Sequence, residues 1–591
     1  MAWLLLAAWV WPLLLALTLL PPAGRERGAT RRRAASLPVL GALPGLAAAL
    51  LLPDGTVLEL PWLFLGTTLG LDPTTRVFLL FSGVIWLAAG IDAAVRLRSP
   101  ADARRFHGLF LLAMAGNLWL ITGQDLVSFY VGFAIMGLSA YGLVIHDGSP
   151  AARRAGRVYL TLTLIGEVSL FAALVMIVQS TGTTLPTPAD LAAIPDAAVA
   201  LVLLGFGIKG GLVPLHLWLP IAYAAAPTPA SAVLSGAMSK TALLGWLRFL
   251  PVGAAALPEW GALLAAAGVL ALFYALPAGL VQADPKVLLG YSSISKMGLV
   301  ALVLGCVLME PALAPAAIPA LVLFAAHHGL VKAALFLGLD QPVRTALRPL
   351  ALAGLAFLAL ALAGAPLTSG ALAKYELKPV IAGAPWPWVG AALAVSTVGV
   401  TLLMGRLLWI AIRRVPQQPV PGPWPGLAWM LLLGLIAVFP FALGPASSWG
   451  TNLVPVAIGA AGAAAVWLAA RANPDWLRPL IGLIPPGDLL VLARPLGQLL
   501  GAAGRWLLRP LQVLAAAIAD RASSGFEALL ARTGARTEDR LRDWRVAGAF
   551  WILITMVLLG IALTAWPTNP PAGPAASEYR PVAPPPGRPP V

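Results

Sequence analysis

The feature that most constrains this chain is a series of apolar runs, each about 20 residues long, that recur along its length. An α-helix of that length crosses the hydrocarbon layer of a bilayer. The 591 residues are 59% hydrophobic and only 11% charged, whereas soluble domains carry about 25% charged residues. So much apolar surface cannot be buried in a water-soluble core. The sequence therefore predicts an all-α polytopic membrane protein of about sixteen transmembrane helices.

The loops between these runs predict the orientation. Alternate loops contain arginine or lysine, from residues 25–33 at one end to 413–414 at the other, with the loop at 216–229 as the exception. The intervening loops, such as 180–196, contain neither residue. Basic loops stay in the cytoplasm, so we expect a bacterial inner-membrane protein with both termini in the periplasm. These loops also account for the net charge of +15; we expect contact with membrane lipids and no nucleic-acid binding.

The composition excludes several kinds of site. The one cysteine, Cys306, lies inside an apolar run, which rules out a disulfide framework and a cysteine-ligated cluster within the chain. No glycine-rich phosphate loop follows a strand, and no His-x-x-x-His pair offers the spacing of metal ligands. We expect this chain to hold no catalytic residue, no metal and no other cofactor.

Changes in hydrophobicity, charge spacing and proline content divide the chain into seven regions. They are N-terminal helices with an outer hairpin at 53–72 (1–105), a first helical repeat (106–250), a second (258–412), accessory helices (424–470), an amphipathic lateral helix (475–546), a last transmembrane helix (547–566) and a proline-rich tail (567–591). The lateral helix carries arginines at helical spacing and is interrupted by prolines. It should lie along the cytoplasmic surface, where it either touches only lipid headgroups or braces a neighbouring subunit.

Ionisable residues within the apolar runs indicate an ion pathway. Such residues cost several kcal/mol each in a membrane and usually mark a functional route. They are Glu167, Lys209, His216, Lys240, Lys296, His327, His328, Lys332, Lys374 and Glu376. Desolvation makes a buried lysine release its proton more readily, and a nearby carboxylate opposes that release. With histidines between them, these lysines would form a proton wire across the middle of the membrane.

Two of these lysines lie in interrupted helices. Lys209 precedes two glycines and Pro214, and Lys374 follows Pro366 and Gly370. Broken helices at membrane depth are tolerated where they line a cavity, and inverted repeats place such breaks at matching positions. The breaks fall in the seventh and twelfth expected spans, which predicts two inverted five-helix repeats.

Four motifs carry a family resemblance. They are Pro-Trp-Leu-Phe-Leu-Gly-Thr-Thr-Leu-Gly-Leu-Asp at 61–72, Pro-Leu-His-Leu-Trp-Leu-Pro at 214–220, Tyr-Ser-Ser-Ile-Ser-Lys-Met-Gly at 291–298 and His-Gly-Leu-Val-Lys-Ala-Ala-Leu-Phe-Leu-Gly at 328–338. In this order they resemble the antiporter-like, proton-translocating subunits of respiratory complex I, energy-converting hydrogenases and Mrp antiporters. The resemblance extends over about residues 53–412. The lateral helix and last span resemble the longest, distal member of the family.

The resemblance implies roles for individual residues. Lys209 would be the central lysine of the first half-channel, Lys240 the connecting lysine, and Lys374 the last one near the exit, with Lys296, His328 and Lys332 between them. The family also places a glutamate in its fifth helix to pair with the central lysine. That position here is Ala134. Either Glu167, one helix later, takes its place, or the first half-channel is altered or inactive.

We therefore expect a subunit that moves protons, or alternatively sodium ions, under the control of partner membrane subunits. A redox-driven NADH-quinone oxidoreductase complex is the first expectation. The alternatives within the family are an Mrp-type antiporter, an energy-converting hydrogenase and an inorganic-carbon uptake complex. Outside these, a stand-alone solute carrier and a structural scaffold with a decayed pathway remain open.

Overall fold

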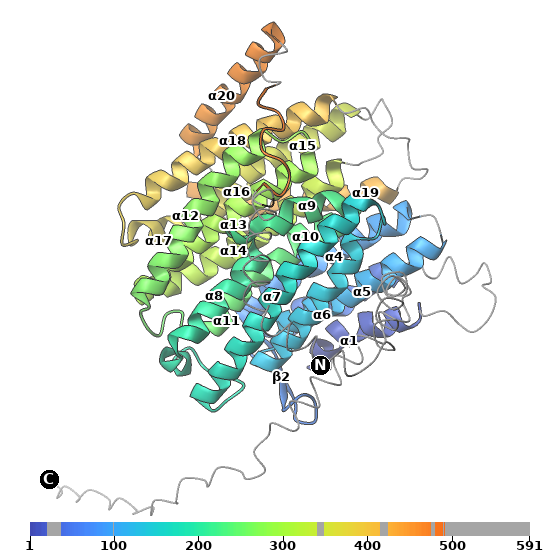
Figure 1. Ribbon diagram of the computed structural model, residues 1–591, viewed down its shortest axis with the longest axis vertical. Helices are drawn as coiled ribbons and strands as arrows, with labels where there is room; N and C mark the ends of the chain where they lie inside the picture. The colour runs from blue at the N-terminus through green and yellow to red at the C-terminus, as the bar shows by residue number, and fades with distance from the viewer. Residues whose placement is uncertain are drawn as a thin grey trace, which may run out of the picture. The chain divides into compact units, whose positions relative to one another are not determined.

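Apolar α-helices make up most of the described chain in the computed structural model (Figure 1). The structure describes residues 1–19, 37–97, 100–339, 348–413, 424–448, 450–473, 479–488 and 490. The helices are α1 (Trp3–Leu17), α3 (Leu43–Leu51), α4 (Pro73–Arg96), α5 (Pro100–Thr122), α6 (Leu126–Val144), α7 (Pro150–Thr181), α8 (Asp196–Gly210), α9 (Trp218–Ala225), α10 (Thr228–Gly236), α11 (Thr241–Phe249), α12 (Pro258–Leu280), α13 (Pro285–Met309), α14 (Ala314–Leu339), α15 (Arg348–Ala363), α16 (Ser369–Glu376), α17 (Lys378–Ala382), α18 (Val389–Arg413), α19 (Trp424–Leu443) and α20 (Leu453–Ala472).

Within the described ranges, 10 helical segments are long and apolar enough to cross a membrane. Three further apolar helices, Trp3–Leu17, Leu37–Leu51 and Arg348–Ala363, are shorter. The expectation of an all-α, multi-pass membrane protein is confirmed at this level. The last expected span at 547–566, most of the lateral helix at 475–546 and the tail at 567–591 lie outside the described residues.

Several helices begin at residues that the sequence marks as caps. The side chains of Asp72, Asp125 and Asp284 accept hydrogen bonds from backbone N–H groups in the first turns of α4, α6 and α13. Proline occupies the first turn of α4 and α13, where no N–H group is needed. In a bilayer this matters because free N–H groups at a helix end find no water in the hydrocarbon layer.

Glycines allow neighbouring helices to approach closely. A Cβ atom on Gly268 of α12 would lie 2.7 Å from the Gly298 carbonyl oxygen of α13, and one on Gly298 would lie 2.6 Å from the Gly268 oxygen. The same reciprocal packing joins Gly116 of α5 to Gly132 of α6. Close packing of small residues is the main source of helix association in lipid, where no hydrophobic effect drives it.

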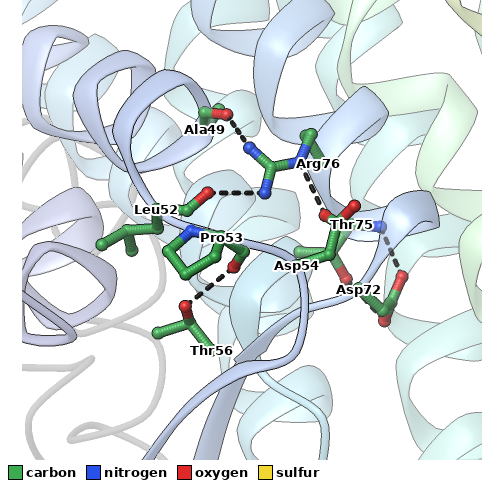
Figure 2. A network of polar contacts seen from close by, with 8 residues as sticks. All are labelled: Ala49, Leu52, Pro53, Asp54, Thr56, Asp72, Thr75 and Arg76. Carbon is green, nitrogen blue, oxygen red and sulfur yellow. Dashed lines mark hydrogen bonds and ion pairs between the residues drawn. The ribbon is translucent and has the colours of Figure 1, made fainter.

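The hairpin expected at 53–72 is confirmed as two antiparallel strands, β1 (Thr56–Leu60) and β2 (Thr67–Leu71). Figure 2 shows how Arg76 of α4 fastens it to the helices. Its guanidinium binds Asp54 at 2.7 Å, the Leu52 carbonyl oxygen at 2.6 Å and the carbonyl oxygen of Ala49. One arginine thus satisfies the last carbonyls of α3 while it anchors the hairpin.

Both expected helix breaks are present. α8 ends at Gly210, and the chain resumes through the short 3-10 helix η2 (Leu215–Leu217) into α9. α15 ends at Ala363, and α16 starts at Ser369. The prediction of a loop at 216–229 is wrong for most of that range, because η2 and α9 continue the broken helix to Ala225. A break with a restart looks like a helix end in sequence, since glycine and proline mark both.

Candidate functional site

The first buried charge pair lies where α7 and α8 pack against α6. Glu167 of α7 and Lys209 of α8 are each 5% exposed. They lie close enough to interact electrostatically but form no direct ion pair within the described residues. The Lys209 Nζ atom lies 5.2 Å from the centre of the Phe133 ring on α6. Neither Lys209 Nζ nor Glu167 Oε1 has a hydrogen-bond partner in the part of the chain described.

Gly137 of α6 gives Glu167 its place. A Cβ atom at Gly137 would lie only 2.5 Å from Glu167 Oε1, so any larger residue would displace this carboxylate. Gly137 is one helical turn beyond Phe133, the ring that faces Lys209. The carboxylate of α7 therefore lies against the same stretch of α6 in which the family resemblance places a glutamate and this chain has Ala134.

The end of α8 presents Lys209 in its last turn. Gly211 adopts a left-handed conformation with φ of 74°, which ends the helix, and its N–H donates to the Ile208 carbonyl oxygen at 3.1 Å. The Trp218 indole N–H donates to the same carbonyl at 2.8 Å. The carbonyl oxygen of Ile208 at this helix end thus has hydrogen-bond donors, while the negative end of the helix dipole lies next to the lysine.

Three further lysines are held by neutral oxygens. Lys240 donates to the Ser235 carbonyl oxygen at 2.6 Å and Lys332 to the Leu289 carbonyl oxygen. Lys374 donates to the Ala363 carbonyl oxygen at 2.8 Å. All three are buried. A lysine side chain retains two N–H donors after it loses a proton, so a carbonyl can hold it in either protonation state.

The two histidines and Lys296 join these lysines. His327 Nδ1 lies 2.9 Å from the Ser369 hydroxyl of α16. Lys240 and Lys296 interact electrostatically with both histidines and with Lys332, and Lys296 also interacts with Lys374. The structure thus brings together six of the predicted residues in one buried group: Lys240, Lys296, His327, His328, Lys332 and Lys374.

The second break shapes the site of Lys374. Gly364 follows α15 with φ of 83°, and a Cβ atom there would lie 3.1 Å from Lys374 Nζ. The amine also donates to the Thr397 hydroxyl of α18 at 2.6 Å. The second acceptor of the Lys374 amine is the Ala363 carbonyl oxygen, the last carbonyl of α15, which lies at the negative end of that helix dipole. As at Lys209, the C-terminal end of an interrupted helix lies beside a buried lysine.

The remaining predicted residues lie elsewhere. His216 is fully buried in η2 and contacts Asp488, Tyr274 and Tyr291 rather than the lysines. Glu376 is half-buried at the end of α16 and forms no ion pair with Lys374 among the residues described. The described residues therefore do not join Glu376 to the lysine series, and its place in the pathway stays a prediction.

Sequence reasoning missed the neutral partners of the pathway. Thr397, Ser369 and the carbonyls at helix ends hold the lysines and histidines, and nothing in their sequence context marks them. Asp488 and Tyr274 were also missed, although an aspartate just after Pro-Pro-Gly and a tyrosine near a helix end are visible in the sequence. In the ranges that the structure covers, no group of three or more His, Cys, Asp or Glu side chains could hold a metal ion.

Comparison with known proteins decides the family. Residues 123–401 match the family described as NADH:quinone oxidoreductase/Mrp antiporter, transmembrane. NADH-quinone oxidoreductase subunit N of Desulforudis audaxviator is 30% identical over 398 residues, which cover 61% of this chain and 76% of that protein. This chain belongs to that family. Its matched region contains every predicted pathway residue from Glu167 to Glu376.

Two solved structures share the fold of this antiporter-like subunit. A chain of the archaeal membrane-bound sulfane sulfur reductase matches with a TM-score of 0.62 and 21% identity, over 78% of this chain and 99% of that one. A chain of the Mrp complex from Dietzia sp. DQ12-45-1b matches with a TM-score of 0.58 and 23% identity, over 97% of this chain and 64% of that one. Other curated relatives are much longer than their matched part, and the chain spans 40% to 49% of their lengths. Family members of these kinds are subunits of multisubunit membrane complexes.

Proposed function

We propose that this antiporter-like subunit translocates protons through its buried Glu, Lys and His side chains, driven by partner subunits. The observation that carries the proposal is the Glu167–Lys209 pair beside the end of a broken helix, where neither Lys209 Nζ nor Glu167 Oε1 has a hydrogen-bond partner in the described chain. A buried pair that is not locked in place costs stability. Such a pair can change its protonation state when its surroundings change.

The first step would occur at Lys209. A nearby carboxylate favours the protonated amine, so the Glu167 carboxylate holds a proton on Lys209. When a partner subunit shifts charge beside the pair, this hold weakens and the ammonium passes its proton to water on the side of Lys240. The amine is left neutral and ready for the next proton. The contact with the Phe133 ring holds Lys209 in position while it is protonated.

The later steps would use repulsion between like charges. Two unit charges about 8 Å apart repel by about 2 kcal/mol at an effective dielectric constant near 20. A proton that reaches Lys240 therefore raises the free energy of a proton on Lys332 or on the nearby histidines and Lys296. Carbonyl oxygens hold the amines in both states, so each lysine can release its proton without moving. Lys374, beside the second break, would release it to the far side.

The two broken helices support an architecture of two inverted repeats, residues 106–250 and 258–412, each with a lysine at its break. We place both termini in the periplasm of a bacterial inner membrane on the alternation of basic loops. In this orientation, Lys374 releases its proton outward.

The driving complex we favour is a redox complex of the NADH-quinone oxidoreductase type. The support is the identity with a subunit N and the breadth of the fold match to a respiratory reductase. An Mrp-type antiporter is the second candidate, because the match to the Mrp chain extends over 97% of this chain. An energy-converting hydrogenase and an inorganic-carbon uptake complex are the remaining candidates for the assembly that contains this subunit.

The test is to purify the native complex in mild detergent and identify its subunits by mass spectrometry. We expect quinone-site and iron–sulfur subunits beside this chain. Small antiporter subunits, a nickel hydrogenase or a large soluble zinc protein would each replace the redox assignment with the corresponding alternative. Vesicles with a pH-sensitive dye inside should acidify or alkalinise without sodium; a strict need for sodium would make sodium the transported ion. Transport of an organic solute by the chain alone would contradict the proposal.

A further inference from the structure

A short segment after α20 returns to the helix bundle. Residues 479–488 lie against the turn between α12 and α13, at the end of the red part of the ribbon in Figure 1. The Gly482 N–H donates to the Val281 carbonyl oxygen at 2.8 Å. The Gln282 amide donates to the Ile484 carbonyl oxygen at 2.9 Å. Two hydrogen bonds thus fix this segment across the ends of two membrane helices.

Its last residue places a carboxylate inside the bundle. The Tyr274 hydroxyl of α12 donates to Asp488 Oδ2 at 2.5 Å. His216 Nε2 lies 3.2 Å from Oδ1 and 3.3 Å from Oδ2 of the same carboxylate. The Tyr291 hydroxyl of α13 interacts with it electrostatically. The side chain of Asp488 is 5% exposed and that of His216 is 0% exposed. The Asp488 carboxylate, which belongs to neither repeat, is therefore buried against His216, one of the predicted pathway residues.

The contact determines how His216 can handle a proton. The hydrogen bond made by one ring nitrogen of a histidine sets the role of the other. Here Asp488 holds Nε2, while Nδ1 is buried and has no partner in the part of the chain that is described. The titratable groups around the ring are Tyr274 from α12, Tyr291 from α13 and Asp488. Nδ1 is thus the nitrogen left to exchange a proton with water.

His216 is also linked to Lys209 through the backbone. Both lie in the one broken helix, on the two sides of its interruption. The Trp218 indole, two residues after His216, bonds to the last turn of α8 beside Lys209. A proton on His216 would therefore stand next in line to the central lysine.

We propose that Asp488 is a positioning residue of the proton pathway, which orients His216 as the proton-uptake group on the cytoplasmic side of Lys209. This inference rests on the proposed function. It makes segment 479–488 part of the transport route, rather than only a connection to the lateral region. The carboxylate holds the protonated imidazole in place through a hydrogen bond and does not take up a proton itself. One proton therefore enters at Nδ1, and one leaves from Nδ1 toward Lys209.

The experiment measures proton transport by the complete complex in vesicles as a function of pH. The variants are Asp488→Asn, His216→Gln and the double variant, each compared with wild type at equal amounts of assembled complex. We expect about a tenfold loss for Asp488→Asn, in line with the loss of a carboxylate that orients a histidine, and a changed pH profile. In the His216→Gln background, adding Asp488→Asn should change the rate less than twofold, because both act through one group.

The outcomes separate the possible roles. Equal transport and an unchanged pH profile for Asp488→Asn would overturn the inference, as would a tenfold loss that persists in the His216→Gln background. If Asp488→Asn does not assemble, Tyr274→Phe tests the same contact, because it removes one donor to the carboxylate and leaves His216 intact. Its effect must also vanish in the His216→Gln background. Full transport by Lys209→Ala would instead refute the proposed function, so the two failures are distinguishable.

Discussion

Replacing Gly137 by alanine should impair transport without destabilising the protein. The new methyl group would lie 2.5 Å from Glu167 Oε1 and 3.2 Å from Thr163 Cγ2. Ordinary van der Waals contact begins near 3.4 Å, so the carboxylate must move by about 0.9 Å. The carboxylate is the far end of a flexible side chain, and the movement costs the fold little.

The expected size of the effect has two bounds. At an effective dielectric constant near 20, moving two charges from about 5 to about 6 Å apart weakens their attraction by about 0.5 kcal/mol, or about 2.5-fold. A misplacement near 1 Å of a group that handles a proton can cost about 100-fold. Transport by Gly137→Ala should therefore fall by between about 2.5-fold and 100-fold. Stability should not fall, because alanine favours a helix over glycine by about 1 kcal/mol.

Gly434→Ala is the matched control. Gly434 also lies inside a helix, α19, but has no atom within 4 Å of its Cβ position. It gains the same helix propensity and moves nothing. Initial rates of proton transport in vesicles and thermal unfolding in detergent would be measured for both variants. If Gly137→Ala transports at the rate of Gly434→Ala, the Glu167 carboxylate does not act from this position and the reasoning fails.

Three further predictions follow from other contacts. Gly364, with φ of 83°, lies beside Lys374, and Gly364→Ala places a methyl group 3.1 Å from Lys374 Nζ; this variant should reduce transport at least tenfold. Gly182→Ala is its control, because Gly182 has a φ of 71° and open space around its Cβ position. The control shares the backbone strain of about 1–2 kcal/mol and should transport normally. Arg248→Met removes a guanidinium that binds three carbonyl oxygens at the end of α5 and one threonine hydroxyl, and should lower the free energy of unfolding by about 3 kcal/mol, seen as a lower melting temperature than that of wild type. Cysteine placed at Gly182 should react with an impermeant thiol reagent from outside and cysteine at Ala151 only from inside, whereas native Cys306 is buried and should not react; labelling of the Gly182 site from the cytoplasm would reverse the proposed orientation.

The sequence predicted the membrane fold because each part of that prediction depends on local pattern. Apolar run length gives the spans, and glycine and proline beside Lys209 and Lys374 give the two breaks. The restart of the helix after the first break was missed, since local sequence does not distinguish a pause from an end. The hairpin at 53–72 was also predicted, and the antiparallel strands β1 and β2 lie there.

The site was only partly predictable because its remaining members come from distant parts of the chain. Charged residues in apolar runs are easily recognised in a sequence, and six of those predicted lie in one buried group. Their neutral partners cannot be recognised in this way, since threonine and serine are common in membrane helices. Asp488 reaches His216 across 272 residues of chain, and no local pattern records such a contact. The room for Glu167 at Gly137 is likewise visible only when α6 and α7 are packed.

The most direct test of the account is proton transport by Lys209→Ala in vesicles that contain the purified complex. Alanine removes the buried group that takes up and releases the proton, and Lys378→Ala is the control, since Lys378 is an exposed lysine beside Tyr375. Lys209→Arg keeps the charge but cannot release its proton. We predict that both Lys209 variants lose at least nine-tenths of transport, corresponding to about 1.4 kcal/mol or more, while Lys378→Ala retains it. Wild-type transport by Lys209→Ala would contradict the central claim that protons pass through this lysine.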